Sequence, residues 1–234
     1  MGNGSQQAAP KVPLSGLTAH DTSPIILRKL GRAEYVPTWE AMRNFTASRD
    51  AATPDELWLL EHPPVFTLGQ GGRPEHLLDP AEVPVVRIDR GGQVTYHGPG
   101  QAVIYLLLDL RRKGYGVKEL VRRMEQAVID LLAEHGVAAA RRAGAPGVYV
   151  GGAKIAALGL RVRAGCCYHG LAFNVDMELE PFRRINPCGY AGLEMTQVSE
   201  LGGPADTGSV ADALAPRLLA ELGLAAAPQS ATST

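Results

Sequence analysis

Short apolar stretches bounded by glycine or proline recur along the chain. Stretches of this length, rich in β-branched residues, are typical of strands rather than helices. Strands are therefore predicted at residues 25–30, 57–60, 83–88, 93–97, 102–108, 148–150, 154–162 and 169–175. A Gly151-Gly152 pair between two of these segments predicts a hairpin turn.

Three other segments carry helix signals. In segment 117–135 the apolar residues form one helical stripe, with Gly136 as a possible cap: Leu120, Val121, Met124, Val128, Leu131 and Leu132. Pro37 suits the first position of a helix running to about residue 49. Ser209 with Asp212 predicts a capping box for a C-terminal helix, which Pro216 should kink or restart.

Predicted strands outnumber helices and do not alternate with them regularly. This order favours an α+β fold with mixed β-sheets and flanking helices over a doubly wound parallel sheet. A chain of 234 residues fits a single domain, expected over residues 24–224. Residues 1–23 and 225–234 are rich in small and polar residues and are expected to be disordered tails, the first without an evident role.

Charge and cysteine content exclude several classes of protein. The 23 basic and 24 acidic side chains give no electrostatic signature for nucleic acid or an anionic membrane. No apolar run reaches the roughly 18 residues of a membrane span, and residues 1–10 lack the apolar core of a secretory signal. Two of the three cysteines, Cys166 and Cys167, are adjacent, which is a poor disulfide or metal framework. A reducing cytoplasm is expected.

Cys188 is the strongest candidate for chemistry. It lies in Arg184-Ile-Asn-Pro-Cys-Gly-Tyr190, where proline and glycine favour a turn that presents the thiol. Free cysteine is more often a small buried apolar residue. Lys154, in an apolar stretch, could change that balance by lowering the thiol pKa or accepting its proton. At an unperturbed pKa near 8.5, only about 3% of a thiol is thiolate at pH 7.

The segment from Arg90 to Gln101 is a candidate ligand loop. Five of its twelve residues are glycine or proline, which would let a ligand approach the backbone closely. A tight β-hairpin with solvated polar side chains is the alternative. The loop matches neither a Walker motif nor a dinucleotide-binding motif. His97 and His169 could orient a ligand, pair with Cys188 or be structural, whereas His62 is most simply a turn residue.

Five segments in order resemble the lipoyl(octanoyl) transferases, and the resemblance covers about residues 25–225. They are Leu60-Glu-His-Pro-Pro-Val-Phe-Thr-Leu-Gly69, Arg90-Gly-Gly-Gln-Val-Thr-Tyr-His-Gly-Pro-Gly-Gln101, Lys154-Ile-Ala-Ala-Leu-Gly159, His169-Gly-Leu-Ala-Phe-Asn174 and Arg184-Ile-Asn-Pro-Cys-Gly-Tyr-Ala-Gly192. The resemblance implies a single acyltransferase domain with a fold like that of the biotin and lipoate protein ligases.

The resemblance also implies an activity, the first step of protein lipoylation. An octanoyl (or lipoyl) group would pass from acyl carrier protein to a specific lysine of lipoyl domains, such as those of 2-oxoacid dehydrogenase complexes. By position, Cys188 is similar to the family's acyl-thioester nucleophile and Lys154 to the residue that lowers its pKa. The implied substrate-binding residues are Arg90, Gly91, Gly92, Gln93, Val94, Thr95, Tyr96, His97, Ala157, Leu158, Gly159, Gly170, Leu171 and Ala172.

Further expectations accompany this hypothesis. Val94, Leu158 and Leu171 could form the walls of an apolar acyl slot. A thioester donor is already activated, so no nucleotide, other cofactor or metal is expected. The protein is expected to be a monomer.

Three alternatives remain open. An ATP-dependent lipoate or biotin ligase would share the fold but needs no nucleophilic thiol, and the Gly-Arg-Gly-Arg-x-x-Gly loop of biotin ligases is absent. A cysteine hydrolase would use His97 or His169 as its base. A non-catalytic module would only bind acyl carrier protein or lipoyl domains.

Overall fold

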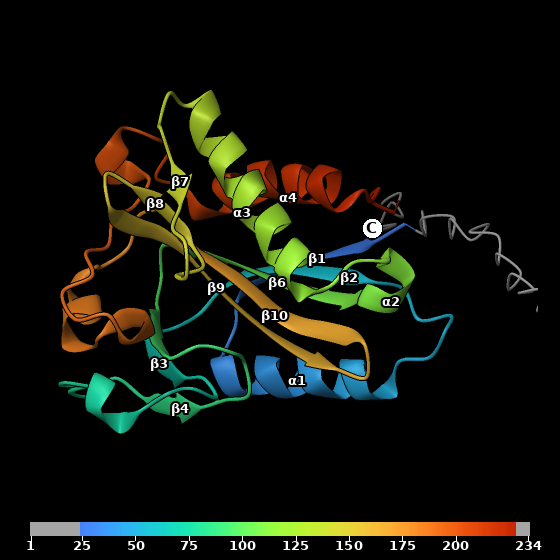
Figure 1. The fold of residues 1–234 in the computed structure, drawn as a ribbon, viewed down its shortest axis with the longest axis horizontal. Helices are drawn as coiled ribbons and strands as arrows, with labels where there is room; N and C mark the ends of the chain where they lie inside the picture. The colour runs from blue at the N-terminus through green and yellow to red at the C-terminus, as the bar shows by residue number, and fades with distance from the viewer. Residues whose placement is uncertain (1–23, 228–234) are drawn as a thin grey trace, which may run out of the picture.

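The computed structural model describes residues 24–227, except for the side chain of Cys188. Figure 1 shows the arrangement of helices and sheets. The predicted tail segments 1–23 and 228–234 lie outside the described residues. Residues 225–227, expected to begin a disordered tail, instead pair with the start of the first strand. The N–H of Ile25 donates to the Ala225 carbonyl at 2.9 Å, and that of Ala227 donates to the Ile25 carbonyl at 2.8 Å.

The main sheet has seven strands, and a smaller sheet has three. The main sheet has the order β1 (Ile26–Arg32), β2 (Glu56–Glu61), β6 (Gln101–Asp109), β10 (Cys166–Asn174), β9 (Ala153–Arg163), β8 (Val148–Val150) and β7 (Ala140–Arg141). The small sheet has the order β4 (Val85–Arg87), β3 (Val65–Leu68) and β5 (Val94–His97). Both sheets contain parallel and antiparallel pairs, which confirms the predicted α+β class with mixed sheets.

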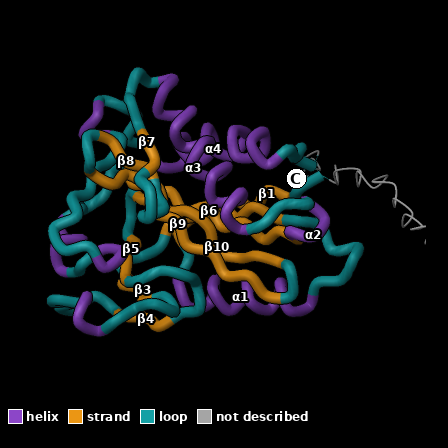
Figure 2. Tube along the Cα trace, in the orientation of Figure 1, coloured by secondary structure: helices purple, strands orange, loops and turns teal. Residues whose placement is uncertain are grey.

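Helices cover both faces of the main sheet. Helices α3 (Val117–Glu134) and α4 (Thr207–Leu222) lie on one face, and α1 (Tyr35–Ser48) lies on the other beside the small sheet (Figures 1 and 2). The short α2 (Leu110–Lys113) follows β6 directly. Alternation along β6 supplies both cores: Ile104 and Leu106 join the α3–α4 side, whereas Val103 and Tyr105 join the α1 side. Four 3₁₀ turns complete the chain, at Pro74–His76, Glu180–Arg184, Pro187–Gly189 and Ser199–Leu201.

Several predicted boundaries were wrong. Helix α1 begins at Tyr35, so Pro37 occupies its third position rather than its first. Helix α4 is capped by Asp206, whose side chain accepts from the Ser209 N–H, and it runs through Pro216 without interruption. Packing of the apolar face of α4 holds that turn despite the missing N–H. Strands β3 and β7 and helix α2, each two to four residues long, were not predicted.

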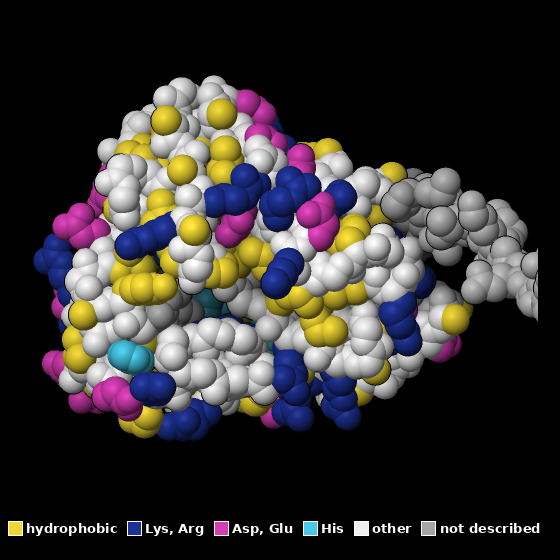
Figure 3. Space-filling view, viewed as in Figure 1, with side chains coloured by type: hydrophobic (Ala, Val, Ile, Leu, Met, Phe, Trp, Pro, Cys, Tyr) yellow, Lys and Arg dark blue, Asp and Glu magenta, His cyan; other side chains and the backbone are white. Residues whose placement is uncertain are grey.

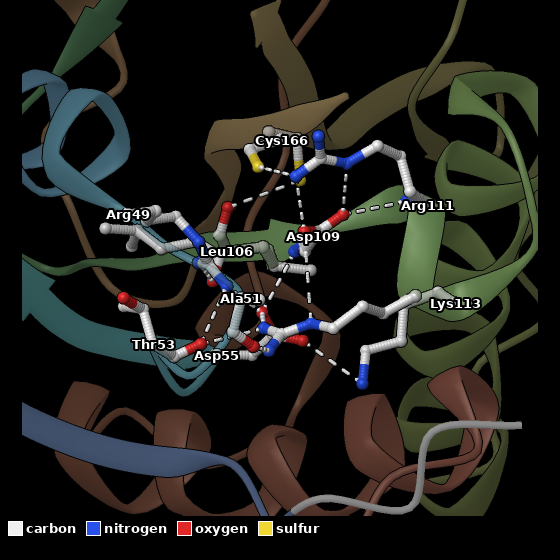
Figure 4. A network of polar contacts seen from close by, with 12 residues as sticks. Arg49, Ala51, Thr53, Asp55, Leu106, Asp109, Arg111, Lys113 and Cys166 are labelled. Atoms are coloured by element: carbon white, nitrogen blue, oxygen red, sulfur yellow. Dashed lines mark hydrogen bonds and ion pairs between the residues drawn. The ribbon is translucent and has the colours of Figure 1, made fainter. Parts of the chain in front are cut away.

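A buried charged network lies where β2, β6 and α2 meet (Figure 4). Asp55 forms ion pairs with Arg49, with Arg112 at 2.7 Å and with Lys113 at 3.1 Å. Its carboxylate also accepts the backbone N–H of Asp109 at 2.9 Å. The network therefore ties the C-terminal end of α1 to the end of the central strand β6.

Among residues 24–227, no helix combines the length and the apolar composition needed to cross a bilayer.

Candidate active site

A pocket of about 500 Å³, its mouth included, lies between the main sheet and the small sheet. Figure 3 shows the molecular surface hollowed on this side, with histidine surface inside the hollow. Twelve of the predicted substrate-binding residues line the pocket: Arg90, Gly92, Gln93, Val94, Thr95, His97, Ala157, Leu158, Gly159, Gly170, Leu171 and Ala172. Gly91 and Tyr96 do not line it. Four further lining residues were not in the predicted set: Tyr35, Val103, Tyr105 and His169.

Small residues on neighbouring strands form the sheet side of the pocket. Ala157 of β9 lies opposite Ala172 of β10, and Gly159 lies opposite Gly170. The side chains of directly opposed residues point to the same face, so Ala157 and Ala172 keep the sheet side of the pocket low. Only glycine fits at position 170, because an added Cβ would lie 2.0 Å from the Ile104 carbonyl oxygen.

Leu158 and Leu171 contribute differently from the expected apolar walls. Leu171 is part of the core beneath α3 and α4, and Leu158 packs against that core. Because alternate residues of a strand point to opposite faces, the side chains of Leu158 and Leu171 point to the face of the sheet opposite the pocket. Only their backbone faces the pocket.

The loop that begins at Arg90 crosses from the small sheet to the main sheet. Arg90 donates through Nη2 to the carbonyl and hydroxyl oxygens of Thr67, at 2.8 and 2.9 Å. The N–H of Gly91 donates to the Leu160 carbonyl at 2.9 Å, which fastens the loop to the edge of β9. Strand β5 pairs with β3 and not with β6, so the hairpin alternative for this segment is wrong.

Tyr96 points away from the pocket. Its ring lies 5.3 Å from that of Phe66 and 5.5 Å from that of Phe182, within the core of the small sheet. Its side chain therefore supports the loop from behind and does not contact the pocket.

The closed end of the pocket is made of neutral polar rings. The Tyr105 hydroxyl donates to His62 Nε2 at 2.7 Å, and His62 Nδ1 donates to the Ala33 carbonyl at 2.6 Å. His97 Nδ1 donates to Gln101 Oε1 at 2.8 Å, and the ring of Tyr35 stacks on His97. Burial lowers the pKa of His62 to about 4 and that of His97 to about 3. His62 directly follows the end of β2, as predicted, and it is a buried residue that supports the closed end of the pocket.

His169 lies within β10 in a left-handed conformation, with φ of +65°. Its Nε2 lies 3.1 Å from Asp89 Oδ1, and the same carboxylate accepts hydrogen bonds from Trp39 and Tyr168. Burial lowers the pKa of His169, against the opposing effect of Asp89. Burial alone would raise the pKa of Asp89, but the hydrogen bonds from His169, Tyr168 and Trp39 hold it below its usual value.

Lys154 is 1% exposed and lies near the start of β9. Its Nζ donates to the Pro146 carbonyl at 3.1 Å and lies 5.1 Å from the centre of the Tyr149 ring. The pairing of β8 with β9 shifts by one residue here, and Ile155 and Ala156 both join the core. This bulge places Lys154 on the same face as Ala157, because it reverses the alternation between them.

The turn at Cys188 packs against the mouth of the pocket. The backbone forms a 3₁₀ turn in which the Gly189 N–H donates to the Asn186 carbonyl at 2.9 Å. An added Cβ on Gly189 would lie 3.4 Å from His76 Nε2 and 3.6 Å from Gln93 Cγ. Pairing of Leu77 with Ile185 holds the segment that leads into the turn.

A stacked series of side chains connects this turn with Lys154. The Arg142 guanidinium lies over the rings of both Tyr190 and Tyr149, at 5.7 and 5.9 Å. Lys154 contacts the Tyr149 ring as well. Downstream of the turn, the Lys154 N–H donates to the Glu194 carbonyl at 2.8 Å. The fold thus brings the neighbourhoods of Cys188 and Lys154 together.

Comparisons with known proteins agree with this architecture. The model of the lipoyl protein ligase A/B catalytic domain matches residues 34–219. The chain belongs to this family. It is 65% identical to the octanoyltransferase of Thiobacillus denitrificans over 195 residues, which are 83% of this chain and 88% of that protein. The predicted family is confirmed, and so is the predicted class of activity, octanoyl transfer by an enzyme.

Solved structures with a similar fold identify the fold of this chain. A crystal structure of lipoate-protein ligase A bound with ATP superposes with a TM-score of 0.72 at 16% identity, covering 90% of each chain. The biotin protein ligase of Aquifex aeolicus gives a TM-score of 0.52 at 13% identity, covering 86% of this chain and 71% of that one. The fold is that of the biotin and lipoate protein ligases, as predicted.

The positions of the other two cysteines make them poor nucleophiles. Cys166 and Cys167 are both buried, and burial raises the pKa of Cys167 to about 12. Cys167 donates weakly to the Leu106 carbonyl at 3.5 Å. Neither lines the pocket, so Cys188 is the candidate nucleophile of the three.

Proposed function

We propose that this protein transfers the octanoyl group from octanoyl-acyl carrier protein to a lysine of a lipoyl domain, through an acyl thioester on Cys188. The observation that carries this proposal is the position of the Cys188 turn, packed on Gln93 at the mouth of the pocket. The octanoyltransferase names of the relatives support the donor group. A reducing cytoplasm suits the free thiol, and the chain works as a monomer.

The first half-reaction forms the acyl-enzyme. The Cys188 thiolate attacks the thioester carbon, the bond from that carbon to the carrier sulfur breaks, and the carrier thiolate leaves. Lys154 stabilises the Cys188 thiolate and then gives its proton to the departing sulfur. No nucleotide is consumed, because one thioester replaces another.

The second half-reaction forms the amide. The neutral Lys154 amine takes a proton from the ammonium of the acceptor lysine, whose nitrogen then attacks the acyl carbon. The nitrogen loses its second proton to solvent, the bond to Cys188 breaks and the thiolate is restored. Burial of Lys154 suits the second half-reaction, in which the amine is neutral, whereas in the first the negative charge of the thiolate favours the ammonium.

Intact-mass analysis after mixing with octanoyl-acyl carrier protein tests the proposal. We expect a covalent octanoyl adduct on the wild-type protein and none on Cys188→Ser. The matched control is Cys167→Ser, a change to a cysteine outside the pocket, which should retain the adduct. An adduct that persists in Cys188→Ser would overturn the proposal.

Two changes at Lys154 separate its roles. Lys154→Arg keeps a positive charge but cannot act as a base, so partial acylation in that variant would assign Lys154 to thiolate stabilisation. Complete loss of acylation in a variant with wild-type circular dichroism would assign it to proton transfer. Lys154→Ala should lose both roles and lower the rate by about 10²–10⁴-fold.

An ATP-dependent ligase is the second candidate, because a lipoate-protein ligase that binds ATP shares the fold. That activity would require ATP and free octanoate and would not require Cys188. Acyl transfer to a lipoyl domain, measured from octanoyl-acyl carrier protein without nucleotide and from octanoate with ATP, distinguishes the two. A Cys-His hydrolase would instead lose acylation in His97→Ala or His169→Ala and keep it in Lys154→Ala.

A further inference from the structure

The pocket has an exposed end and a buried end. Strand β8 pairs with β9 only as far as Ala156, so β9 has no neighbouring main-sheet strand on that side from Ala157 onward. Gly92 is exposed and Ala157 is partly exposed, whereas Val103 and Tyr105 are 1% and 4% exposed. A ligand therefore enters at β9 and reaches across β10 towards β6 and the start of α1.

The depth of this path can be compared with an acyl chain. From β9 to β6 there are two strand spacings, or about 10 Å. An extended eight-carbon acyl chain spans about 9 Å, given C–C bonds near 1.5 Å. A chain that begins at the mouth, where the Cys188 turn lies, would thus end at Val103, Tyr105 and Tyr35.

The buried end is rigid. Tyr105 is fixed by its hydrogen bond to His62, whose other ring nitrogen is bonded to the backbone. Tyr35 packs on His62 and His97, with ring centres 4.8 and 5.6 Å apart. An acyl chain cannot push these rings aside without breaking buried hydrogen bonds, which makes overlong chains costly.

Tyr35 separates the pocket from further apolar residues. On its other side it packs in a small cluster with Val65 and Ile88, both buried. Removing the ring of Tyr35 would join the pocket to this cluster and offer apolar surface to additional methylenes.

We propose that Tyr35, with Val103 beside it, sets the acyl chain length by closing the pocket after eight carbons. The inference rests on the proposed function, because it places the thioester at the Cys188 turn. It assigns a specificity role to two residues outside the Gly-rich loop and the β9 and β10 segments.

Competition between acyl-carrier-protein thioesters of eight, ten and twelve carbons tests the proposal, with adducts counted by intact mass. Each buried methylene is worth about fourfold in binding. We expect Tyr35→Ala to raise the decanoyl-to-octanoyl ratio at least tenfold. Val103→Ala, a smaller truncation, should raise it about fourfold. Tyr115→Ala, which removes a tyrosine outside the pocket, should leave the ratio at its wild-type value.

The ratio is measured within one sample, so it does not depend on the folded fraction. Unchanged ratios in Tyr35→Ala and Val103→Ala, with octanoyl acylation retained, would overturn the chain-length role. Should Tyr35→Ala fail to fold, the ratio in Val103→Ala decides. Failure of the wild-type protein to form any octanoyl adduct would instead overturn the proposed function.

Discussion

Two buried polar regions of this protein are built on opposite electrostatic principles. The closed end of the pocket contains histidines and tyrosines that burial keeps neutral, such as His62 and His97. The network around Asp55, in contrast, contains fully formed ions. Neutral groups suit the end of a pocket that receives an apolar chain, because an unpaired ion there would hold water. A junction between elements has no such limit, and ion pairs can fix its geometry.

The largest expected effect is on the charged network. Asp55→Asn leaves Arg49, Arg112 and Lys113 without their shared carboxylate, and breaking a buried ion pair costs about 3–5 kcal/mol. For a chain of this size we expect Tm to fall by about 10 °C. Octanoyl self-acylation per folded molecule should stay at the wild-type level, since Asp55 does not line the pocket.

The control for that measurement is Lys29→Ala. This change removes an exposed ion pair with Asp212, and such pairs contribute less than about 1 kcal/mol. If Asp55→Asn lost acylation without losing stability, the distinction between a structural and a functional polar region would be wrong.

An intermediate effect is expected from pH at the closed end of the pocket. The pKa of His97 is about 3 in the folded protein and about 6.5 in the unfolded chain. Between these values the unfolded chain binds more protons, so stability falls as pH drops from about 6.5 towards 3. We expect His97→Gln to reduce the dependence of the unfolding free energy on pH by about 1.4 kcal/mol per pH unit. Urea unfolding between pH 6.5 and 4.5 measures this dependence. Equal slopes in both proteins would show that His97 is not held neutral.

The smallest expected effect is at Asp109, in a lower pH range. The ion pair with Arg111 lowers the pKa of Asp109 to about 2, below the unfolded value of about 3.9. This contribution is complete above about pH 4 and is lost as pH falls towards 2, because the unfolded chain is then the first to take up the proton. Solvent screens the pair because the Arg111 side chain is mostly exposed, so Asp109→Asn should cost about 1 kcal/mol at neutral pH and flatten the plot of unfolding free energy against pH below pH 4. If the unfolding free energy of Asp109→Asn depended on pH below pH 4 as steeply as that of the wild type, the ion pair of Asp109 with Arg111 would not contribute to stability.

The sequence predicted those helices and strands that have a clear pattern of apolar residues along the chain. The apolar stripe of α3 shows helical periodicity, and β6 is a short continuous apolar run that follows Gly100, which is typical of a buried strand. The predicted capping box of Ser209 and Asp212 was wrong. The Ser209 N–H donates instead to the side chain of Asp206, which caps the helix three residues earlier. Strand β3 was missed because it directly follows Pro63 and Pro64, which favour a turn or loop.

The pocket was predicted only in part, for a similar reason. The glycine-rich loop and the small residues of β9 and β10 are visible as motifs along the chain. Tyr35 carries no such signal, because a tyrosine near a helix start is ordinary until the helix is placed against His62 and His97. Leu158 was expected as a wall, but the strand alternation that turns it into the core depends on the bulge near Lys154.

The order of residues thus determined the family, the mixed α+β class and the candidate pair Cys188 and Lys154, because glycine-rich turns and buried cations constrain the chain locally. Only the tertiary structure decided which groups meet. Strand register set Ala157 opposite Ala172 on the sheet side of the pocket, and packing of α1 closed the far end of the pocket with neutral rings. Register and packing depend on contacts between residues distant in sequence, and no local pattern encodes those distances.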